Sequence, residues 1–540
     1  MHPSPSHSTP ARTVATKLVT LSSGDYRGLE GRPVDVQVDL SSPGNPGFII
    51  VGLPGKSTRE SRDRIRAAIH NSGFFFPKDR ILVNLAPASR EKHGVGFDLP
   101  IAMGILVASR QVVPRATDGD VRRALRQIGF VGELGLSGEL RPVRGSLLIA
   151  ESLRQRGVRT HIVSRANARE VSLLDGVEVH GASSLRDAVA VLNGEGTPFA
   201  KEAPGEPPPR EFGDLDFADV RGQEASKRGC LIMAAGRHNL LLSGPPGVGK
   251  TMLARRIPGI LPPLTLDEAI SVLQVESVLK GDEEIHLLRE RPFRAPHHTI
   301  SYAGMVGGGS VPRPGEVTRA HHGVLFLDEF PEFSRRVLEA LREPLEAESI
   351  TIGRGGGSLT FPANFLLAAA MNPCPCGYLG HPRRSCTCSP RLVDAYRGRL
   401  SGPLLDRIDL FLPVASVELA DLVGEAGTSG LDSASLAAQV LEATARQARR
   451  WGKGATNSHA PLRRLLRSDL SEPSAIEVLR RSAEKLCLSA RGFARCLRVA
   501  RSIADLEGRE RVAEEHVLEA LQYRWPSGRR PGDALPPGGV

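Results

Sequence analysis

Residues 240–251 read Leu-Leu-Leu-Ser-Gly-Pro-Pro-Gly-Val-Gly-Lys-Thr, and this stretch decides the fold class. Leu240–Leu242 has the character of a short buried strand, and Met252–Ile257 that of a helix. Between them lies the full G-x-x-x-x-G-K-[ST] pattern in its required strand–loop–helix setting, which disfavours a chance glycine-rich turn. In such a loop, backbone N–H groups close around phosphates at a helix N-terminus. The expected nucleotide-binding residues are Gly244, Pro245, Pro246, Gly247, Val248, Gly249, Lys250 and Thr251.

The next polar positions fit a magnesium nucleotide. Lys250 is expected to place its charge beside the β- and γ-phosphates of ATP, and the Thr251 hydroxyl to bind Mg²⁺. A second apolar run, Val324–Leu327, ends directly in Asp328 and Glu329. Asp328 is expected to act as an outer ligand of Mg²⁺, and Glu329 to orient or deprotonate the attacking water. The glycine-rich loop with Lys250 and the apolar run that ends in Asp328 and Glu329 reinforce each other as signs of a nucleotide site.

A third apolar run, Phe365–Met371, ends in Asn372. Its amide suits the positioning of the attacking water, although an isolated Asn at this place is more often a plain strand cap. Just before this run, Ile350–Ile352 and Leu359–Phe361 flank a glycine-rich tip that carries Arg354. This pattern predicts a β-hairpin.

Length and composition bound the remaining possibilities. The chain has 540 residues, which suggests two to four domains, and it is 40% hydrophobic and 24% charged. These values exclude long disorder or fibrous repeats as the main architecture. No apolar run reaches the roughly 18 residues of a membrane span, and the N-terminus lacks the apolar core of a secretory signal. The net charge of +10 is compatible with a polyanionic partner.

Four of the seven cysteines lie close together in the pattern C-x-C-x₉-C-x-C. Without an export signal, such a cluster indicates a metal site or reduced thiols in the cytoplasm rather than a disulfide framework. Paired thiols can form a tetrahedral Zn²⁺ site, with idle reduced thiols as the alternative. Adjacent histidines at 297–298 and 321–322 would point opposite ways on a strand, which disfavours a metal there and favours structural or nucleotide-sensing roles. The candidate zinc ligands are Cys374, Cys376, Cys386 and Cys388.

Changes in composition suggest the domain boundaries. Prolines, glycines and charges replace any apolar period in 194–213, and a second soft stretch spans 424–433. We therefore expect an N-terminal domain at 1–195, a linker at 196–213, a P-loop core at 214–420, a helical region at 432–525 and a disordered tail at 526–540.

Several motifs resemble those of the YifB/ComM family of magnesium-chelatase-like AAA+ ATPases. The resemblance covers roughly residues 16 to 525, and its PHHT and NPCPCG runs are specific to that family. The motifs are 244–251, 325–329, Asn372 and Pro403-Leu-Leu-Asp-Arg-Ile-Asp409, together with 51–54, 84–87, 291–299, 306–316 and 371–377.

The resemblance implies an α/β fold, with a three-layer P-loop AAA+ core and a helical lid. A Lon-protease-like α+β domain would precede the core. It further implies an ATP- and Mg²⁺-dependent homo-hexamer that is not bound to a membrane. ComM members are implied to be motors for DNA branch migration on recombination intermediates during natural transformation, so single-stranded or branched DNA is the expected partner.

Two further roles are carried over by motif. Val220 lies in the segment Asp219–Gln223, which resembles the adenine-side segment of the family. Arg407 occupies the place of the arginine finger, which reaches the nucleotide of the neighbouring subunit, and a guanidinium suits this role because it forks onto phosphate oxygens. The alternative for Arg407 is a surface salt bridge to Asp406 or Asp409.

Arg491 resembles the sensor-2 arginine and is expected to share one helix face with Arg495 and Arg498. Three arginines on a lid helix suit ATP phosphates or nucleic acid, and a solvated face is the alternative. Because the corresponding hairpin of related ring motors points into a central pore, Arg354 is a candidate contact to the DNA backbone. A structural turn with an idle arginine is the competing interpretation.

The N-terminal region lacks the catalytic dyad of Lon proteases. The stretch that matches their nucleophile loop is 94–98, where Gly96 replaces the serine, and the expected lysine position within 144–148 holds no lysine. Without a nucleophile and its base, acyl transfer has no route.

The leading hypothesis for the function of the chain is a DNA-remodelling ATPase. A chelatase-type motor that acts on a protein partner is second, and an ATP-dependent protease is third.

Overall fold

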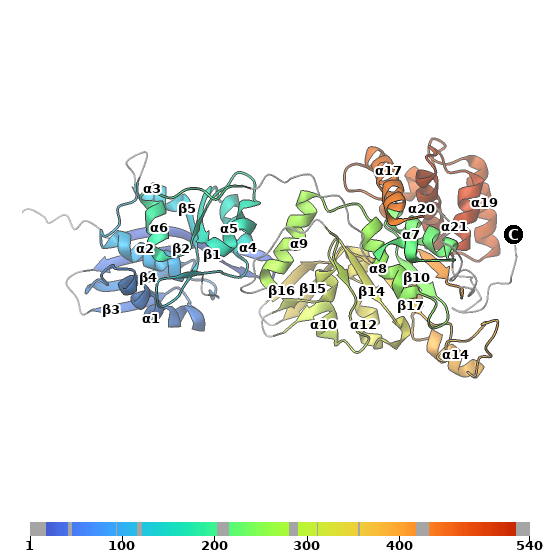
Figure 1. Cartoon of the computed structure of the whole chain (residues 1–540), viewed down its shortest axis with the longest axis horizontal. Coiled ribbons are helices and arrows are strands. Elements are labelled where there is room, and N and C mark those ends of the chain that lie inside the picture. The colour runs from blue at the N-terminus through green and yellow to red at the C-terminus, as the bar shows by residue number, and fades with distance from the viewer. Residues whose placement is uncertain are drawn as a thin grey trace, which may run out of the picture. The chain divides into compact units, whose positions relative to one another are not determined.

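The computed structural model describes residues 18–41, 46–92, 94, 96–115, 121–201, 215–279, 290–309, 312–354, 357–416 and 431–524. Most of the expected linker, residues 424–430 of the second soft stretch and the tail at 526–540 lie outside these ranges. The chain forms two compact units, one of residues 1–203 with 273–287 and the other of residues 204–272 with 288–540 (Figure 1). Within the described ranges, no helix is long and apolar enough to cross a bilayer.

The first unit is built on a mixed sheet. Its strands are β1 (Leu18–Arg27), β2 (Glu30–Ser41), β3 (Gly47–Val51), β4 (Arg80–Ala86), β5 (Ile128–Val131), β8 (Thr160–Ser164) and β9 (Glu178–Ala182), and β6 (Glu133–Leu134) pairs with β7 (Leu140–Arg141) as a separate ribbon. The strand order is β3-β4-β2-β1-β5-β8-β9, with β2 antiparallel to β1 and β4 and the other pairs parallel. The helices are α1 (Lys56–Asn71), α2 (Asp98–Ala108), α3 (Val121–Arg126), α4 (Ser146–Gln155), α5 (Arg165–Ser172) and α6 (Leu185–Leu192).

Helices cover both faces of this sheet. Alternate residues of β2, including Val34, Val36 and Val38, are fully buried in the cluster that contains the apolar side of α2. This alternation follows from the two-residue period of a strand. In β8, Ile162 joins that cluster, whereas Val163 packs in the cluster that contains α4. The sheet is therefore the middle layer of the unit.

The second unit contains a parallel sheet. Its strands are β10 (Leu240–Ser243), β11 (Phe293–Arg294), β14 (Val324–Leu327), β17 (Leu366–Met371) and β18 (Leu410–Pro413), in the order β11-β14-β17-β10-β18. Two antiparallel ribbons pair β12 (Gly307–Gly308) with β13 (Arg313–Pro314) and β15 (Ser349–Arg354) with β16 (Gly357–Pro362). The helices before the C-terminal region are α7 (Glu224–Gly236), α8 (Lys250–Ile260), α9 (Leu266–Leu279), α10 (Tyr302–Val306), α11 (Glu316–Arg319), α12 (Arg335–Ala340), α13 (Pro344–Ala347), α14 (Pro390–Arg397) and α15 (Gly402–Leu405). From Leu273 onward, α9 belongs to the first unit.

The central strands of this sheet are buried along their whole length. Every residue of β10, β14 and β17 is buried, which explains why these strands read as continuous apolar runs rather than alternating ones. Because the strands are parallel, their carboxyl ends meet at one edge of the sheet. The polar residues that follow these ends are thereby brought together.

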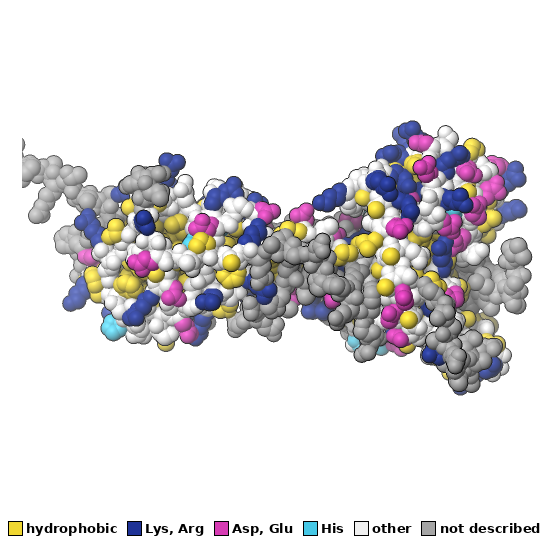
Figure 2. All heavy atoms as spheres, turned by 45° about the horizontal axis from the view of Figure 1, so that its top comes forward, with side chains coloured by type: hydrophobic (Ala, Val, Ile, Leu, Met, Phe, Trp, Pro, Cys, Tyr) yellow, Lys and Arg dark blue, Asp and Glu magenta, His cyan; other side chains and the backbone are white. Residues whose placement is uncertain are grey.

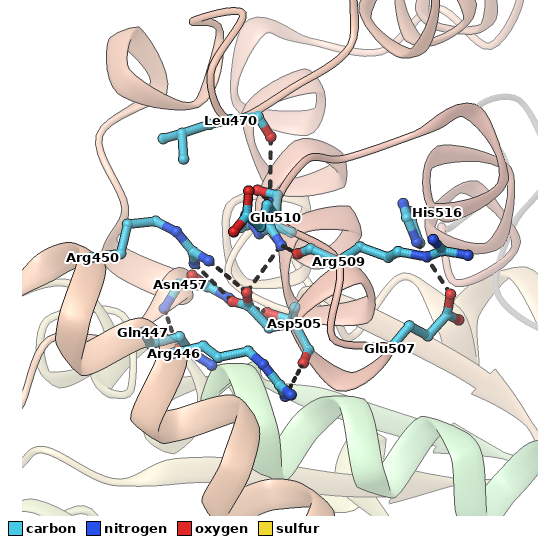
Figure 3. A network of polar contacts seen from close by, with 12 residues as sticks. Arg446, Gln447, Arg450, Asn457, Leu470, Asp505, Glu507, Arg509, Glu510 and His516 are labelled. Atoms are coloured by element: carbon cyan, nitrogen blue, oxygen red, sulfur yellow. Dashed lines mark hydrogen bonds and ion pairs between the residues drawn. The ribbon is translucent and has the colours of Figure 1, made fainter.

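The C-terminal helices, drawn in orange to red in Figure 1, pack around a buried carboxylate. They are α17 (Ser433–Trp451), α18 (Leu462–Leu465), α19 (Pro473–Lys485), α20 (Ala490–Leu506) and α21 (Glu514–Gln522). Asp505 is fully buried and pairs with Arg450 at 2.7 Å and with Arg501 at 2.9 Å, while Asn457 donates to it at 2.8 Å (Figure 3). A buried charge with partners on several sides ties α17 and the segment that follows it to α20.

Candidate nucleotide site

The loop after β10 has the backbone geometry of a phosphate cradle. Gly247 and Gly249 adopt φ values of +82° and +88°, which side-chain-bearing residues rarely adopt. Gly249 caps α8, whose first residue is Lys250. The loop therefore ends at a helix N-terminus, where free N–H groups and the helix dipole favour an anion.

Lys250 is held in place by its own loop. Its Nζ donates to the carbonyl oxygens of Gly244 at 2.7 Å and Pro245 at 2.8 Å, and to Oδ1 of Asn372 at 3.1 Å. Burial lowers the pKa of Lys250 to about 8, against the attraction of Asp328. A desolvated ammonium next to a phosphate cradle gains strongly from a bound phosphate.

Thr251 and Asp328 form the second contact of this edge. The Thr251 hydroxyl donates to Oδ2 of Asp328 at 2.7 Å, and Oδ1 of Asp328 accepts from the backbone N–H of Glu329 at 2.9 Å. A hydroxyl and a carboxylate are ligands that suit Mg²⁺ beside phosphates, so this donor set fits the ion. Four of the residues expected from the sequence, Lys250, Thr251, Asp328 and Asn372, therefore lie together.

Glu329 has a partner that the sequence did not indicate. Its backbone adopts a φ of +52°, and its Oε2 lies 3.0 Å from Nδ1 of His298. His298 comes from the loop after β11, 31 positions earlier in the chain. Only the fold brings the two side chains together.

The adjacent histidines do not lie on a strand as assumed, although the structural role expected of them fits the contacts of His321. Both pairs lie in turns or loops rather than on a strand, and their ring centroids lie 4.1 Å apart in the pair 297–298 and 3.9 Å apart in the pair 321–322, with the ring planes tilted by 33° and 41°. His321 lies 3.1 Å from the Ser271 hydroxyl and accepts from the Asn364 N–H, also at 3.1 Å. Burial lowers the pKa of His321 to about 3, so this ring is neutral at pH 7 and serves a structural contact.

A cavity of about 500 Å³ adjoins the loop. Val220 is buried and lines it, and the nearby Gln223 donates to the Val248 carbonyl at 2.6 Å. The cavity therefore connects the segment 219–223 with the phosphate cradle. Four residues of the cysteine-rich loop also line it, which sequence reasoning missed: Tyr378, His381, Arg383 and Arg384.

Arg407, which is expected to reach the nucleotide of a neighbouring subunit, and Arg491 both lie away from the phosphate cradle of their own chain. Arg407, Arg491, Arg495 and Arg498 line one cavity of about 490 Å³, together with Asn239 and Phe365. Asn239 precedes β10 and Phe365 precedes β17, so this cavity lies at the amino edge of the sheet. The phosphate cradle follows the carboxyl end of β10. A four-residue strand spans roughly 13 Å, so these arginines are remote from the cradle of their own chain.

The side chain of Arg407 forms an ion pair, but not with either of the two aspartates expected from the sequence. It pairs with Glu346 and donates to the Pro403 carbonyl at 2.6 Å, rather than pairing with Asp406 or Asp409. The two aspartates lie near Arg495 instead, at 3.9 and 3.7 Å. Arg407 and Arg491 thus lie in one cavity whose five arginines outnumber the three carboxylates that line it, so positive charge is in excess there.

The four cysteines converge. Their sulfur atoms lie within 4.8 Å of one another, with Cys374 at 3.3 Å from Cys376 and both at 3.6 Å from Cys386. Thiolates bound to Zn²⁺ at about 2.3 Å would form a tetrahedron with edges of about 3.8 Å. Two backbone N–H groups also donate to the sulfur atoms: that of Cys376 to Sγ of Cys388 and that of Cys388 to Sγ of Cys386, each at 3.4 Å. The donor set fits a tetrahedral metal.

The hairpin that carries Arg354 is rooted in the second unit. In β15 and β16, Thr351 pairs with Thr360, and Ile350 and Phe361 are buried. Arg354 pairs with Gly357 through the backbone, whereas its side chain and the tip residues 355–356 lie outside the described part of the chain.

Comparisons with known proteins assign the family. The family models "Magnesium chelatase, subunit ChlI", "Subunit ChlI of Mg-chelatase" and "Magnesium chelatase, subunit ChlI C-terminal" match residues 216–422, 36–167 and 430–524. Competence protein ComM of Haemophilus influenzae is 44% identical over 92% of this chain and 95% of its own length. YifB of Escherichia coli is 41% identical over 92% and 95%, and a magnesium-chelatase 67 kDa subunit of Heliobacterium mobile is 26% identical over 31% and 29%. The chain therefore belongs to the YifB/ComM family of magnesium-chelatase-like AAA+ ATPases.

Proposed function

We propose that this protein is an ATP-driven ring motor of identical subunits, each of whose nucleotide sites is completed by a neighbouring copy. One observation carries the proposal: Lys250, Thr251 and Asp328 lie at the carboxyl edge of the sheet, whereas Arg407 and Arg491 lie at its amino edge. Two parts of one site at opposite edges of a subunit can meet only between copies. A closed ring, a hexamer by family resemblance, satisfies this for every subunit.

The roles within one site follow from the contacts. Lys250 exchanges its two carbonyl partners for phosphate oxygens, and Thr251 and Asp328 hold Mg²⁺. When bound, this ion neutralises charge on the β- and γ-phosphate oxygens. Glu329 accepts the proton of the attacking water, with Asn372 positioning that water and His298 setting the direction of the carboxylate. Arg407 and Arg491 of the next subunit stabilise the charge on the transferred phosphoryl group.

The proposed substrate of the motor is single-stranded or branched DNA in the cytoplasm, through branch migration during natural transformation. Support comes from the Haemophilus influenzae relative, which is named a competence protein, and from the net charge of +10. On the face shown in Figure 2, basic and acidic side chains are interspersed over the second unit. We therefore assign the DNA contact to Arg354 on the hairpin, facing the pore of the ring, rather than to the face in that view.

The other parts of the chain receive structural roles. Residues 1–195 form a Lon-protease-like domain without catalysis: a Cβ on Gly96 would lie 3.3 Å from a methyl group of Val143 and 3.5 Å from Val131, in apolar surroundings. Residues 196–213 link it to the core at 214–420, residues 432–525 form the helical lid, and 526–540 form a tail. Zn²⁺ joins Cys374, Cys376, Cys386 and Cys388, so the purified protein should hold about one zinc per chain.

A second candidate is a chelatase-type motor that remodels a protein partner. The three matching family models, which are named for a magnesium-chelatase subunit, favour it. The nucleotide chemistry would be the same in both cases, so only the stimulating partner separates them.

The deciding measurement is the steady-state ATPase rate without DNA, with single-stranded DNA and with a four-way junction. We expect DNA to raise the rate several-fold, with an effect that declines steeply as salt rises because phosphate contacts release counterions. Lys250→Ala protein, prepared in the same way, controls for contaminating ATPases. Equal rates with and without DNA would reject DNA as the substrate and favour the protein-remodelling motor.

A further inference from the structure

The cysteine-rich loop, residues 374–388, packs directly on the phosphate cradle. Gly377 has a φ of +84°, and a Cβ built on it would lie 2.6 Å from Cδ of Pro246, inside the P-loop. A contact this close excludes any side chain at position 377 without displacement of one of the two loops. The cradle and the cysteine-rich loop are therefore fitted to each other at this point.

Beyond Gly377, the loop presents a braced cluster of polar side chains. Arg384 donates to the Tyr378 hydroxyl at 2.8 Å, and its guanidinium carbon lies 5.1 Å from the centre of the Tyr378 ring. The His381 ring meets the Tyr378 ring edge-on at 5.7 Å, and its Nδ1 accepts from the backbone N–H groups of Arg383 and Arg384. The cluster holds the Arg384 side chain in one place, which lowers the entropic cost of a further contact.

This cluster lines the same cavity as the P-loop, and the cavity has a cationic excess. Arg221, Arg383 and Arg384 line it, whereas the carboxylate of Asp219 in its wall is paired with Arg256 at 2.9 Å. A wall of guanidinium groups beside a phosphate cradle suits a polyanion such as a nucleoside triphosphate.

We propose that the cysteine-rich loop forms the roof of the ATP site, in which Arg384, positioned by Tyr378, binds the phosphate groups of the nucleotide. This inference rests on the proposed ATPase function and assigns a further binding residue to the same site. A metal ion held by the four cysteines would fix both ends of the loop, so its loss should weaken nucleotide binding through the position of Arg384.

The test measures equilibrium affinity for a fluorescent ATP analogue carrying an N-methylanthraniloyl group, with Mg²⁺, on the full-length protein. Arg384→Ala should weaken binding about tenfold, because one charge-assisted contact is lost. Tyr378→Phe keeps the ring and loses only the hydroxyl that accepts from Arg384, so its loss should be smaller. The matched control is Arg391→Ala, an exposed arginine on α14 that is not among the residues lining the cavity.

The metal arm uses the double variant Cys386→Ser with Cys388→Ser, whose folding is checked by its thermal unfolding midpoint. We expect it to lose the metal and to bind the analogue about as weakly as Arg384→Ala does. Because Arg384 is exposed, Arg384→Ala keeps the proposal testable if the cysteine variant does not fold.

The outcomes separate this inference from the function on which it rests. If Lys250→Ala abolishes binding while Arg384→Ala stays within twofold of the wild type, the roof is rejected and the ATP site stands. An Arg391→Ala loss equal to that of Arg384→Ala would also reject it, since the effect would then be general charge. Undiminished binding by Lys250→Ala would instead reject the nucleotide site itself.

Discussion

The two edges of the five-stranded sheet carry opposite halves of the proposed chemistry and are built differently. At the carboxyl edge, side chains contact one another directly: Lys250 with Asn372 at 3.1 Å, and Thr251 with Asp328 at 2.7 Å. At the amino edge, five arginines line one cavity, and carboxylates also line it, among them Glu346, which pairs with Arg407. The carboxyl edge is thus built from direct contacts beside the phosphate cradle, whereas the amino edge is a cavity with an excess of positive charge.

The difference teaches where a ligand is needed to complete the structure. Clustering of like charges costs free energy unless an anion compensates them. At the amino edge Glu346 pairs with Arg407, and burial lowers the pKa of Arg495 below its usual value because its charge is desolvated. A phosphate from a neighbouring subunit would offset the excess of positive charge that the carboxylates of this cavity leave. Substitutions confined to one edge at a time test this difference.

Lys250→Ala breaks the carboxyl edge and should have the largest effect. The γ-phosphate loses its fixed positive partner, so we expect both nucleotide binding and ATP hydrolysis to fall below detection. Binding of the fluorescent analogue and release of phosphate measure the two losses. Lys453→Ala, which removes an exposed lysine after α17, should match the wild type. Normal turnover of Lys250→Ala would remove the basis of the comparison.

Arg407→Ala breaks the amino edge and should separate binding from chemistry. We expect about a thousandfold loss of kcat, because the charge on the transferred phosphoryl group is unsupported. Affinity for the nucleotide should stay close to that of the wild type, since the cradle is intact. Single-turnover hydrolysis and analogue binding on the same preparation measure both quantities.

Mixing the two variants should restore complete nucleotide sites at some interfaces between subunits. In a ring of Arg407→Ala and Lys250→Ala subunits, some interfaces combine an intact cradle with an intact arginine, so activity should partly return. An arginine acting within its own chain predicts no recovery on mixing. A surface arginine predicts no deficit in the first place, and either result would contradict the assignment of the amino edge to the neighbouring site.

Glu329→Gln should have the next largest effect. The amide keeps the size of the side chain but cannot accept a proton, so we expect about a hundredfold slower hydrolysis with ATP binding retained. Glu332→Gln is a matched control, because that glutamate lies on the same segment and pairs with Arg399 instead. Equal rates for Glu329→Gln and the wild type would assign water activation to another residue.

The carboxyl edge was more predictable from the sequence than the amino edge. The run 240–251 contains its strand, its turn and the start of its helix within 12 consecutive residues, and Asp328 and Asn372 directly follow buried strands. Parallel strands then place these residues together without further information. Each of these predictions depends on residues that are neighbours in the sequence, so short sequence patterns were enough to make them.

Contacts between distant segments could not be predicted in the same way. Arg407 pairs with Glu346, 61 positions away, although Asp406 and Asp409 are its neighbours in sequence. His298 meets Glu329, and Tyr378 lines the nucleotide cavity, because of the path of the loops that carry them. The ring contacts within the histidine pairs occur in turns or loops, and no periodic pattern marks a turn of that kind. These choices depend on tertiary packing, which hydrophobic periodicity does not encode.

The last and smallest expected effect concerns Arg354, which belongs to neither edge. No hairpin residue is among the described residues that line the nucleotide cavity, and buried Ile350 and Phe361 root the hairpin in its own unit. Arg354→Ala should therefore leave basal hydrolysis unchanged and reduce DNA-stimulated hydrolysis a few-fold. The slope of DNA affinity against salt should also become shallower, because fewer counterions are released when a phosphate contact is lost.

Arg391→Ala again provides the matched control, and both rates are measured across a range of salt concentrations. If basal and stimulated rates fall together, Arg354 acts on the nucleotide site or on folding, and the separation between edge chemistry and DNA contact is wrong. If neither rate nor the salt slope changes, the arginine is idle and DNA contacts another part of the ring. A loss restricted to the DNA-stimulated rate is expected only if ATP is hydrolysed at one site, DNA is bound at another, and the ring couples the two sites.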